Sequence, residues 1–223
     1  MADLFVEAEA LSRIFDRGGR LVTALQDISL RIEAGDRIAL LGPSGSGKTT
    51  LLNLIAGLDR PTAGRIEWPA LGPADQLRPV QVGVMFQSRS LIPALTCLEN
   101  VELPLRLAGQ EGDLRATAMV ALSRFHVEHI AEMLPEEISG GQAQRVALAR
   151  SVVAAPRLLL ADEPTGQLDR HTAEATVESL LGWADETRAL VVATHDQQVA
   201  NRMTKIWELV HGVLVHGRRL SAA

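Results

Sequence analysis

The sequence predicts an α/β fold in which a mainly parallel sheet is flanked by helices and carries an antiparallel β subdomain and an inserted α-helical subdomain. Short apolar runs that end in polar residues alternate with helical stretches, as is typical of parallel strands in such folds. There are four of these runs, at residues 38–41, 80–87, 158–163 and 190–195. The composition changes between Gln87 and Ser139, where Pro93 and Pro104 precede a helical pattern over residues 113–126. This change predicts a mainly helical insertion into the core.

Both ends of the chain are predicted to form antiparallel strands. Residues 4–11 and 21–32 are rich in apolar and β-branched residues, with turn-forming residues between and after them. Such a pattern is typical of strands joined by tight turns, and these strands should lead into the first strand of the core. At the other end, residues 205–220 predict two strands around Gly212.

The length of the chain bounds its domain organisation. A chain of 223 residues is at the upper end for one domain and is long enough to bury a substantial core. We therefore expect a single domain over residues 1–223. The β subdomain and the nucleotide-binding core should take up approximately residues 1–87 and 156–223, and the helical subdomain approximately residues 88–155.

Charge and composition narrow the classes of function. The formal net charge is −5 and the basic residues are scattered, whereas nucleic-acid binding needs clustered Lys and Arg, so we expect no nucleic acid partner. The single cysteine, Cys97, cannot form a disulfide within the chain, which is compatible with a reducing compartment. The first residues lack a basic segment followed by an apolar one, and no apolar run approaches about 18 residues. We expect neither a signal peptide nor a membrane span.

Residues 42–50 match the phosphate-binding pattern G-x-x-x-x-G-K-[ST], with an apolar run before them and a helical pattern after them. They are Gly42, Pro43, Ser44, Gly45, Ser46, Gly47, Lys48, Thr49 and Thr50. In such a loop, glycines let backbone N–H groups face phosphate oxygens, and the start of the helix adds partial positive charge. We expect Lys48 to reach the β- and γ-phosphates and Thr49 to ligate Mg²⁺. This predicts a P-loop NTPase core; the alternative is a glycine-rich turn before a core helix.

Asp162 and Glu163 end a buried apolar run, and phosphoryl transfer needs two such carboxylates. We expect Asp162 to hold Mg²⁺ and Glu163 to orient and polarise the attacking water. The alternative is a strand that ends in an acidic turn. The phosphate loop upstream favours the catalytic interpretation.

Residues 139–142, Ser-Gly-Gly-Gln, precede a helical pattern that continues to residue 153. Ser139 and Gln142 satisfy the S/T-x-x-E/Q capping box. A cap with two loop glycines explains these residues without a ligand. The residues alone therefore leave open whether Ser139, Gly140, Gly141 and Gln142 bind one.

With these motifs, the chain resembles the nucleotide-binding subunit of an ATP-binding cassette (ABC) transporter. Ser-Gly-Gly-Gln followed by Gln-Arg-Val-Ala at residues 144–147 is similar to the hallmark of that family. The other motifs keep the family's order and approximate spacing over almost the whole chain: the phosphate loop, Gln87, Asp162 with Glu163, Leu168 with Asp169, and His195.

Within the family, the chain resembles the group of lipoprotein-release, macrolide-export and cell-division ATPases. The similarity rests on residues 98–101, 103–105 and 161–166. Gln167 departs from that group, in which asparagine is usual, and the stretch before Gln87 is unusually short. The transported substrate is therefore left open.

The resemblance implies that ATP and Mg²⁺ bind between two copies of the chain in a head-to-tail homodimer. Ser139, Gly140 and Gly141 of one subunit would then face the γ-phosphate held by Lys48 of the other. Two more residues are assigned to the nucleotide site on this basis, Gln142 and Asp169.

It also implies roles for three residues outside these motifs. Gln87 would contact Mg²⁺ and the attacking water, His195 would contact the γ-phosphate, and Phe15 would stack on adenine, where the family usually has tyrosine. Each has a structural alternative. Gln87 could be a polar strand end, His195 a structural hydrogen-bonding residue, and Phe15 a packing residue of a core or hairpin.

The implied function is Mg²⁺-dependent ATP hydrolysis at the cytoplasmic face of a membrane, which drives a separate integral membrane permease. The alternative is a regulatory or mechanotransmission module that acts on a membrane partner without moving cargo. A soluble ABC protein of DNA repair or translation is disfavoured, because the sequence has neither a long coiled-coil insertion nor a second cassette.

The segment at residues 90–98 is too apolar for a loop exposed on a solitary enzyme. Exposed apolar patches usually mark interfaces. We therefore place the permease contact on this segment together with Glu99 and Asn100. The alternative is that Leu91, Leu95 and Leu98 pack the helical subdomain.

Overall fold

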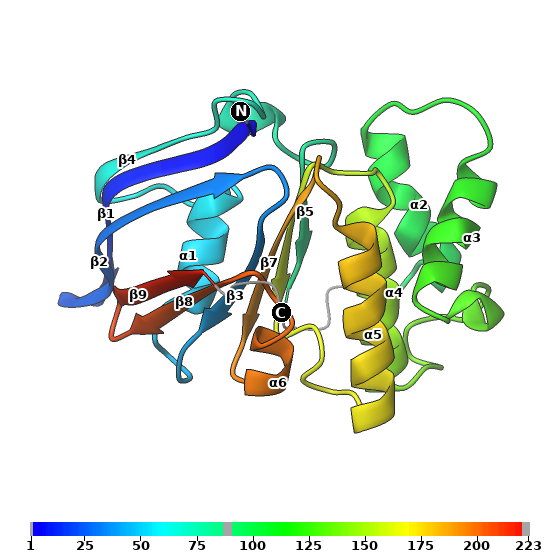
Figure 1. The fold of residues 1–223 in the computed structure, drawn as a ribbon. Coiled ribbons are helices and arrows are strands. Elements are labelled where there is room, and N and C mark those ends of the chain that lie inside the picture. The colour runs from blue at the N-terminus through cyan, green and yellow to red at the C-terminus, as the bar shows by residue number, and fades with distance from the viewer. Residues whose placement is uncertain (1, 87–90, 220–223) are drawn as a thin grey trace.

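The computed structural model describes residues 2–86 and 91–219, which form two sheets and a group of helices (Figure 1). The larger sheet has six strands in the order β5-β6-β7-β3-β8-β9. They are β3 (Arg37–Leu41), β5 (Val82–Met85), β6 (Leu158–Asp162), β7 (Ala189–Thr194), β8 (Lys205–Val210) and β9 (Val213–Arg219). Every neighbouring pair is parallel except β8 with β9. The predicted α/β fold with a mainly parallel sheet is confirmed.

The smaller sheet is antiparallel and has the strand order β2-β1-β4. Its strands are β1 (Leu4–Arg17), β2 (Arg20–Glu33) and β4 (Ala63–Glu67). Pairing of β1 with β2 continues to a two-residue turn at Gly18 and Gly19, both with positive φ. Hairpin turns of this kind favour glycine. Because the pairing continues up to this turn, both strands are longer than the sequence pattern predicted.

The helices are α1 (Lys48–Ile55), α2 (Cys97–Leu107), α3 (Leu114–Arg124), α4 (Gly140–Val152), α5 (Arg170–Trp183) and α6 (Gln197–Ala200). Short 3₁₀ helices lie at Ala74–Gln76 and Glu128–Ile130. Helices α2, α3 and α4 pack on one another and lie on the side of the large sheet away from the antiparallel sheet (Figure 1). Within the described ranges, no helix has the length and apolar character needed to cross a membrane.

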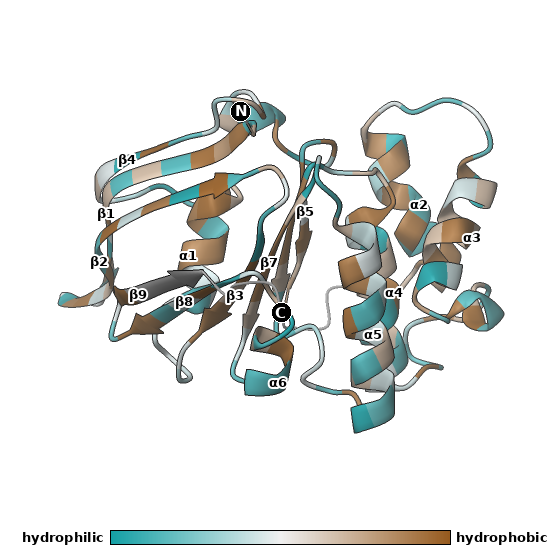
Figure 2. Ribbon diagram, in the orientation of Figure 1, coloured by the Kyte–Doolittle hydropathy of each residue, from teal (hydrophilic) through white to brown (hydrophobic). Residues whose placement is uncertain are grey.

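The central strands are mostly apolar, and both faces of the sheet are covered. Leu158 and Leu160 of β6 belong to the core that includes α1 and the antiparallel sheet. Leu159 and Ala161 belong to the core shared with the helices α2 to α5. Parallel strands buried on both faces read as continuous apolar runs, which Figure 2 shows as brown arrows. This burial holds the strand ends, and the side chains after them, in fixed positions.

Helix α2 was missed in the sequence, where Pro104 was taken to lie before the helical stretch. Pro104 lies inside α2, and the helix begins with a capping box formed by Thr96 and Glu99. The Thr96 hydroxyl oxygen accepts from the Glu99 N–H at 3.2 Å, and the Glu99 carboxylate accepts from the Thr96 N–H at 2.8 Å. The capping box at the start of α2 thus offsets the destabilisation caused by Pro104 inside the helix.

The structure buries several residues of the segment at 90–100, on which we placed the permease contact. Leu91 is 9% exposed and Leu98 is 1% exposed, and both pack in the core of the helical group. Asn100 is fully buried, and its side-chain amide bonds to backbone groups of Ile92, Leu95 and Thr96. Leu91 and Leu98 fill the interior, so the core alternative holds for these two residues, whereas Ile92 is 38% exposed. Residues 87–90 lie outside the described part of the chain.

Candidate functional site

A hollow of about 670 Å³ opens at the carboxyl ends of the central strands. Strands β6, β7 and β3 are neighbours, so the segments that follow them meet at one edge of the sheet. Ligands of parallel α/β sheets bind at this edge. The hollow is lined by Phe15, Val22, Thr23, Ala24, Ser44, Gly45, Gly47, Lys48, Thr49, Thr50, Asp162, Glu163 and His195.

Close packing requires glycine at two positions of the phosphate loop. Gly47 has φ 106°, and a Cβ there would lie 2.6 Å from the carbonyl oxygen of Ala24. A Cβ on Gly42 would lie 2.3 Å from the carbonyl oxygen of Leu209. Neither position has room for a side chain, so β2 and β8 shape the loop from outside.

Lys48 is the first residue of α1 and is buried beneath the loop. Its Nζ donates to the carbonyl oxygens of Gly42 at 2.7 Å and Pro43 at 3.2 Å, and it lies 3.9 Å from Oε1 of Glu163. Among the described residues, the buried hydroxyl of Ser46 has no hydrogen-bond partner. The loop thus presents the positive charge of Lys48 at a helix start, which suits an anion such as phosphate.

Thr49 and Asp162 meet at the floor of the hollow. The Thr49 hydroxyl donates to Oδ2 of Asp162 at 2.6 Å, and Asp162 is 3% exposed. Burial raises the pKa of Asp162, and the hydrogen bond from Thr49 works against that rise. A hydroxyl beside a buried carboxylate is an oxygen donor set that fits Mg²⁺. The structure therefore brings together two of the predicted metal ligands.

Glu163 lies beside Asp162 but contacts different groups. Its carboxylate oxygens lie 3.1 Å and 3.0 Å from Nδ1 of His195, and the Glu163 residue is 8% exposed. The side chain of His195 is 74% exposed, so its ring stands at the open side of the hollow. A buried carboxylate held between Lys48 and His195 can face a water molecule that enters from this side.

Phe15 of β1 lies in the wall of the hollow, beside the β2 residues Val22 and Thr23, which the sequence reasoning missed. Its ring is half-buried, and the Arg13 guanidinium lies 4.3 Å from the ring centroid. Arg13 is held in turn by Asp59, at 2.8 Å. The structure thus places an aromatic ring in the hollow, where adenine stacking was predicted. Val22 and Thr23 lie beside Phe15 because β2 pairs with β1 in this hairpin.

Ser139 caps α4 as predicted. The hydroxyl oxygen of Ser139 accepts from the Gln142 N–H at 3.2 Å, and Oε1 of Gln142 accepts from the Ser139 N–H at 2.8 Å. Asp169 caps α5 through Thr172, whose N–H and hydroxyl donate to it at 3.0 Å and 2.6 Å. These hydrogen bonds from Thr172 lower the pKa of Asp169.

These two helix starts line a second hollow of about 300 Å³. Its lining is Ser139, Gly140, Gly141, Gln142, Arg145, Gln167, Leu168, Asp169 and Thr172. In the described part of the chain, no residue lines both hollows. The predicted nucleotide-binding residues are therefore divided within one chain into a phosphate-loop group and a helix-start group.

Gln87 lies outside the described residues, so its predicted contacts with Mg²⁺ and water stay predictions. The remaining loop residues Gly42, Pro43 and Ser46 lie behind the lining of the first hollow. A phosphate loop, a hydroxyl–carboxylate pair and a second carboxylate at the ends of parallel strands define the class of P-loop nucleoside triphosphatases.

Comparison with known proteins narrows this class to one family. A profile described as "ABC transporter" matches residues 25–166. The chain is 40% identical to the lipoprotein-releasing system ATP-binding protein LolD of Legionella pneumophila (strain Paris), over 96% of this chain and 98% of that protein. It is 41% identical to the macrolide export ATP-binding/permease protein MacB of Rhodopseudomonas palustris (strain HaA2), over 99% of this chain and 35% of that protein.

Solved structures agree. The dimeric ABC transporter cassette MJ0796 superposes with a TM-score of 0.92 at 35% identity, over 98% of this chain and 100% of that chain. The post-hydrolysis state of the same cassette, bound to ADP and Pi, gives a TM-score of 0.91. The protein belongs to the ABC transporter family and is an ATP-hydrolysing subunit of that family, as the sequence motifs predicted.

Proposed function

We propose that the protein binds ATP with Mg²⁺ in a head-to-tail homodimer and that hydrolysis drives a separate integral membrane permease. The division of the nucleotide-binding residues between two hollows carries this proposal. A second copy in head-to-tail orientation would bring the helix start at Ser139 to the phosphate loop of the first. The related MJ0796 cassette was solved as a dimer.

The phosphate loop binds the β- and γ-phosphates through its backbone N–H groups and Lys48. Thr49 and Asp162 would hold Mg²⁺, joined by Gln87, and the ion when bound neutralises charge on the phosphate oxygens. On the far wall, Phe15 presents a ring face to adenine.

Glu163 is the carboxylate left to act on water. It accepts a hydrogen bond from the water and polarises it, while His195 contacts the γ-phosphate and steadies the carboxylate. The water oxygen bonds to the γ-phosphorus as the bond to the β–γ bridging oxygen breaks. ADP and inorganic phosphate leave, and the water proton departs with the phosphate.

The partner copy completes the site. Ser139, Gly140 and Gly141 lie at the start of α4, where N–H groups and the helix dipole favour a γ-phosphate. ADP lacks the γ-phosphate, so it joins the two surfaces less well than ATP does. Gln142 and Asp169 hold the two helix starts that line this surface.

The permease contact is better placed on a groove between β5 and the helices α2 and α4 than on residues 90–100. This groove has a volume of about 300 Å³, and Leu58, Phe86 and Leu107 are among its lining residues. Leu107 is 72% exposed and Leu58 is 43% exposed. In the ABC family, a short permease helix enters the groove beside the helical subdomain, and exposed apolar residues around such a groove fit that partner.

A permease partner places the protein on the cytoplasmic face of a membrane. Transport is favoured over mechanotransmission because the relatives named above belong to a lipoprotein-releasing system and to macrolide export. The MacB relative carries ATP-binding and permease functions in one chain, of which this chain covers 35%. The remainder of such a protein is the part that a separate permease would supply here.

Light scattering with the Glu163→Gln variant tests the shared site. With MgATP we expect the mass of a dimer, and with MgADP that of a monomer. Ser139→Asp in the same background is the matched control, since aspartate keeps the helix cap while its charge repels the γ-phosphate. That double variant should bind ATP and stay monomeric. A Glu163→Gln protein that stays monomeric at saturating MgATP would contradict the shared site.

A further inference from the structure

Gln144 of α4 is a buried polar residue that contacts two parts of the active site. It is 8% exposed. Its Nε2 donates to the carbonyl oxygen of Glu163 at 2.7 Å, and its Oε1 accepts from the N–H of Gln167 at 3.2 Å. Both polar atoms of one side-chain amide are thus used by backbone groups, one at the catalytic carboxylate and one in the turn before α5.

The backbone of Glu163 needs such support. Its φ is 51°, in the left-handed region, where a residue other than glycine is strained. Three hydrogen bonds hold the backbone of this residue. The Glu163 N–H donates to the carbonyl oxygen of Ala193 at 2.8 Å, and the Glu163 carbonyl oxygen accepts from Nε2 of Gln144 at 2.7 Å and from the N–H of Gly166 at 3.2 Å. This backbone conformation sets the direction of the Glu163 side chain toward Lys48 and His195.

We propose that Gln144 is a positioning residue for ATP hydrolysis, which holds the Glu163 peptide in its left-handed conformation and keeps the carboxylate aimed at the attacking water. Without Nε2, the Glu163 carbonyl oxygen loses its donor from α4, which is the shortest of the three hydrogen bonds that support the strained conformation. A displacement of about 1 Å at a reacting group is enough to slow a reaction 100-fold.

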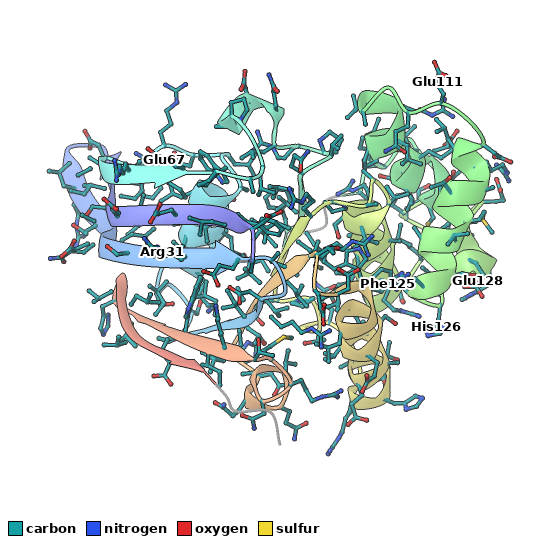
Figure 3. All side chains as sticks on the ribbon, turned by 45° about the horizontal axis from the view of Figure 1, so that its top comes forward. Arg31, Glu67, Glu111, Phe125, His126 and Glu128 are labelled. Atoms are coloured by element: carbon teal, nitrogen blue, oxygen red, sulfur yellow. The ribbon has the colours of Figure 1, made fainter. Side chains whose placement is uncertain are left out.

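The same residue links the two sites of a dimer, and this second step rests on the proposed head-to-tail arrangement. Helix α4 starts at the residues that would meet the partner's ATP, and Gln144 lies in its first turns. The side chain of the next residue, Arg145, donates to the carbonyl oxygens of Phe125 and His126, which follow α3 and are labelled in Figure 3. When α4 closes on the partner's nucleotide, the hydrogen bond from Gln144 therefore carries this movement to Glu163 of the same chain.

Two substitutions separate the hydrogen bonds of Gln144. Gln144→Met keeps the length and removes both bonds. Gln144→Glu keeps an acceptor for the Gln167 N–H and removes the donor to Glu163. We expect both to lower kcat about 10- to 100-fold while the Kd for ATP changes less than about threefold, because the phosphate loop is untouched.

Thr176→Val is the matched control. Thr176 is 2% exposed, and its hydroxyl donates within α5 to the carbonyl oxygen of Thr172 at 2.8 Å. This substitution removes a hydrogen bond within α5 in which Glu163 takes no part, so it should lower the melting temperature with kcat unchanged. Loss of kcat in the Gln144 variants beyond that of Thr176→Val, at equal Kd for ATP, supports positioning.

The link between sites is read from the dependence of the ATPase rate on ATP and from light scattering with MgATP. We expect the wild type to hydrolyse ATP cooperatively and Gln144→Glu to lose that cooperativity. If the wild type itself shows no ATP-driven association and no cooperativity, the homodimer proposal fails and only the positioning role in one chain remains to be judged from kcat. If the wild type associates and both variants keep a normal kcat, the positioning role is overturned. Loss of folding by both variants would also overturn it, because Gln144 would then be a structural residue.

Discussion

At the residue scale, Asp162 and Glu163 are neighbours in the chain that contact different groups. The Asp162 carboxylate accepts from the Thr49 hydroxyl at 2.6 Å, and the Glu163 carboxylate lies between Lys48 and His195. Backbone conformation separates them, because Asp162 ends β6 while Glu163 has a positive φ. Adjacent residues of the same chemistry can therefore serve the metal and the water separately.

This difference predicts the kinetics of the Glu163→Gln variant. Glutamine keeps the shape of the side chain but polarises water poorly, so kcat should fall about 10²–10⁴-fold. The affinity for MgATP should stay near the wild-type value, because the phosphate loop and Asp162 are unchanged. Steady-state hydrolysis and calorimetric ATP titration measure the two quantities. A variant with near-normal turnover would remove Glu163 from the catalytic role.

Phe15 allows a second prediction at this scale. Replacing Phe15 by leucine removes the ring face, and base–aromatic stacking contributes about 1–3 kcal/mol, so the Kd for ATP should rise about 5- to 150-fold. Phe15→Tyr should bind ATP as the wild type does. A leucine variant that binds ATP normally but melts at a lower temperature would show that Phe15 is a packing residue instead.

At the scale of the elements, most of the predicted binding residues lie at the starts of α1, α4 and α5. We expect the stabilisation that the cap of α5 provides to depend on pH. Hydrogen bonds from Thr172 lower the pKa of Asp169. A carboxylate whose pKa is lower in the folded state stabilises the fold above its unfolded value of about 3.9, and this contribution is lost as the pH falls through the folded pKa.

We therefore expect wild type and Asp169→Asn to differ most in free energy of unfolding near neutral pH. The difference should shrink once the pH falls below about 3.9. Urea unfolding without nucleotide, followed from neutral to acid pH, measures this. Thr172→Val removes the hydroxyl donor and should reduce the pH-dependent part. A difference that grows toward acid pH would contradict the assignment.

At the scale of the whole molecule, we propose partners for two surfaces of the chain: the helix starts at Ser139 and Asp169, and the apolar groove beside α2. Two leucines of α2 differ in exposure. Leu107, which lines the groove, is 72% exposed, and Leu98 is 1% exposed. Their positions predict opposite outcomes for the same substitution.

Leu107→Asp should abolish co-purification with the membrane partner while the isolated subunit keeps its melting temperature and its basal ATPase. Leu98→Asp should lower the melting temperature sharply, because an unpaired carboxylate in the core destabilises the fold by several kcal/mol. Thermal melts of both variants beside a pull-down on the solubilised permease compare them. A Leu107→Asp protein that still binds the permease would move the contact away from the groove.

Much of the fold could be predicted from the sequence because the patterns that indicate its strands and helices are local. The four apolar runs correspond to β3, β5, β6 and β7, although β5 spans only Val82–Met85. Helix α2 was not recognised, because Pro104 argues against a helix locally while packing and the Thr96–Glu99 cap favour one. The strand β4 was also missed, since its pairing with β1 depends on residues more than fifty positions away in the chain.

The phosphate loop, the carboxylate pair and the helix cap were recognised from the sequence, because each motif depends on the spacing of a few neighbouring residues. Burial, and the division of the predicted binding residues between two hollows, depend on tertiary packing. An apolar segment such as residues 90–98 has the same composition in a core as on an interface, and burial depends on which distant surfaces cover it. The bond from Gln144 to Glu163 likewise joins residues 19 positions apart, and only the packing of α4 against the end of β6 brings them together.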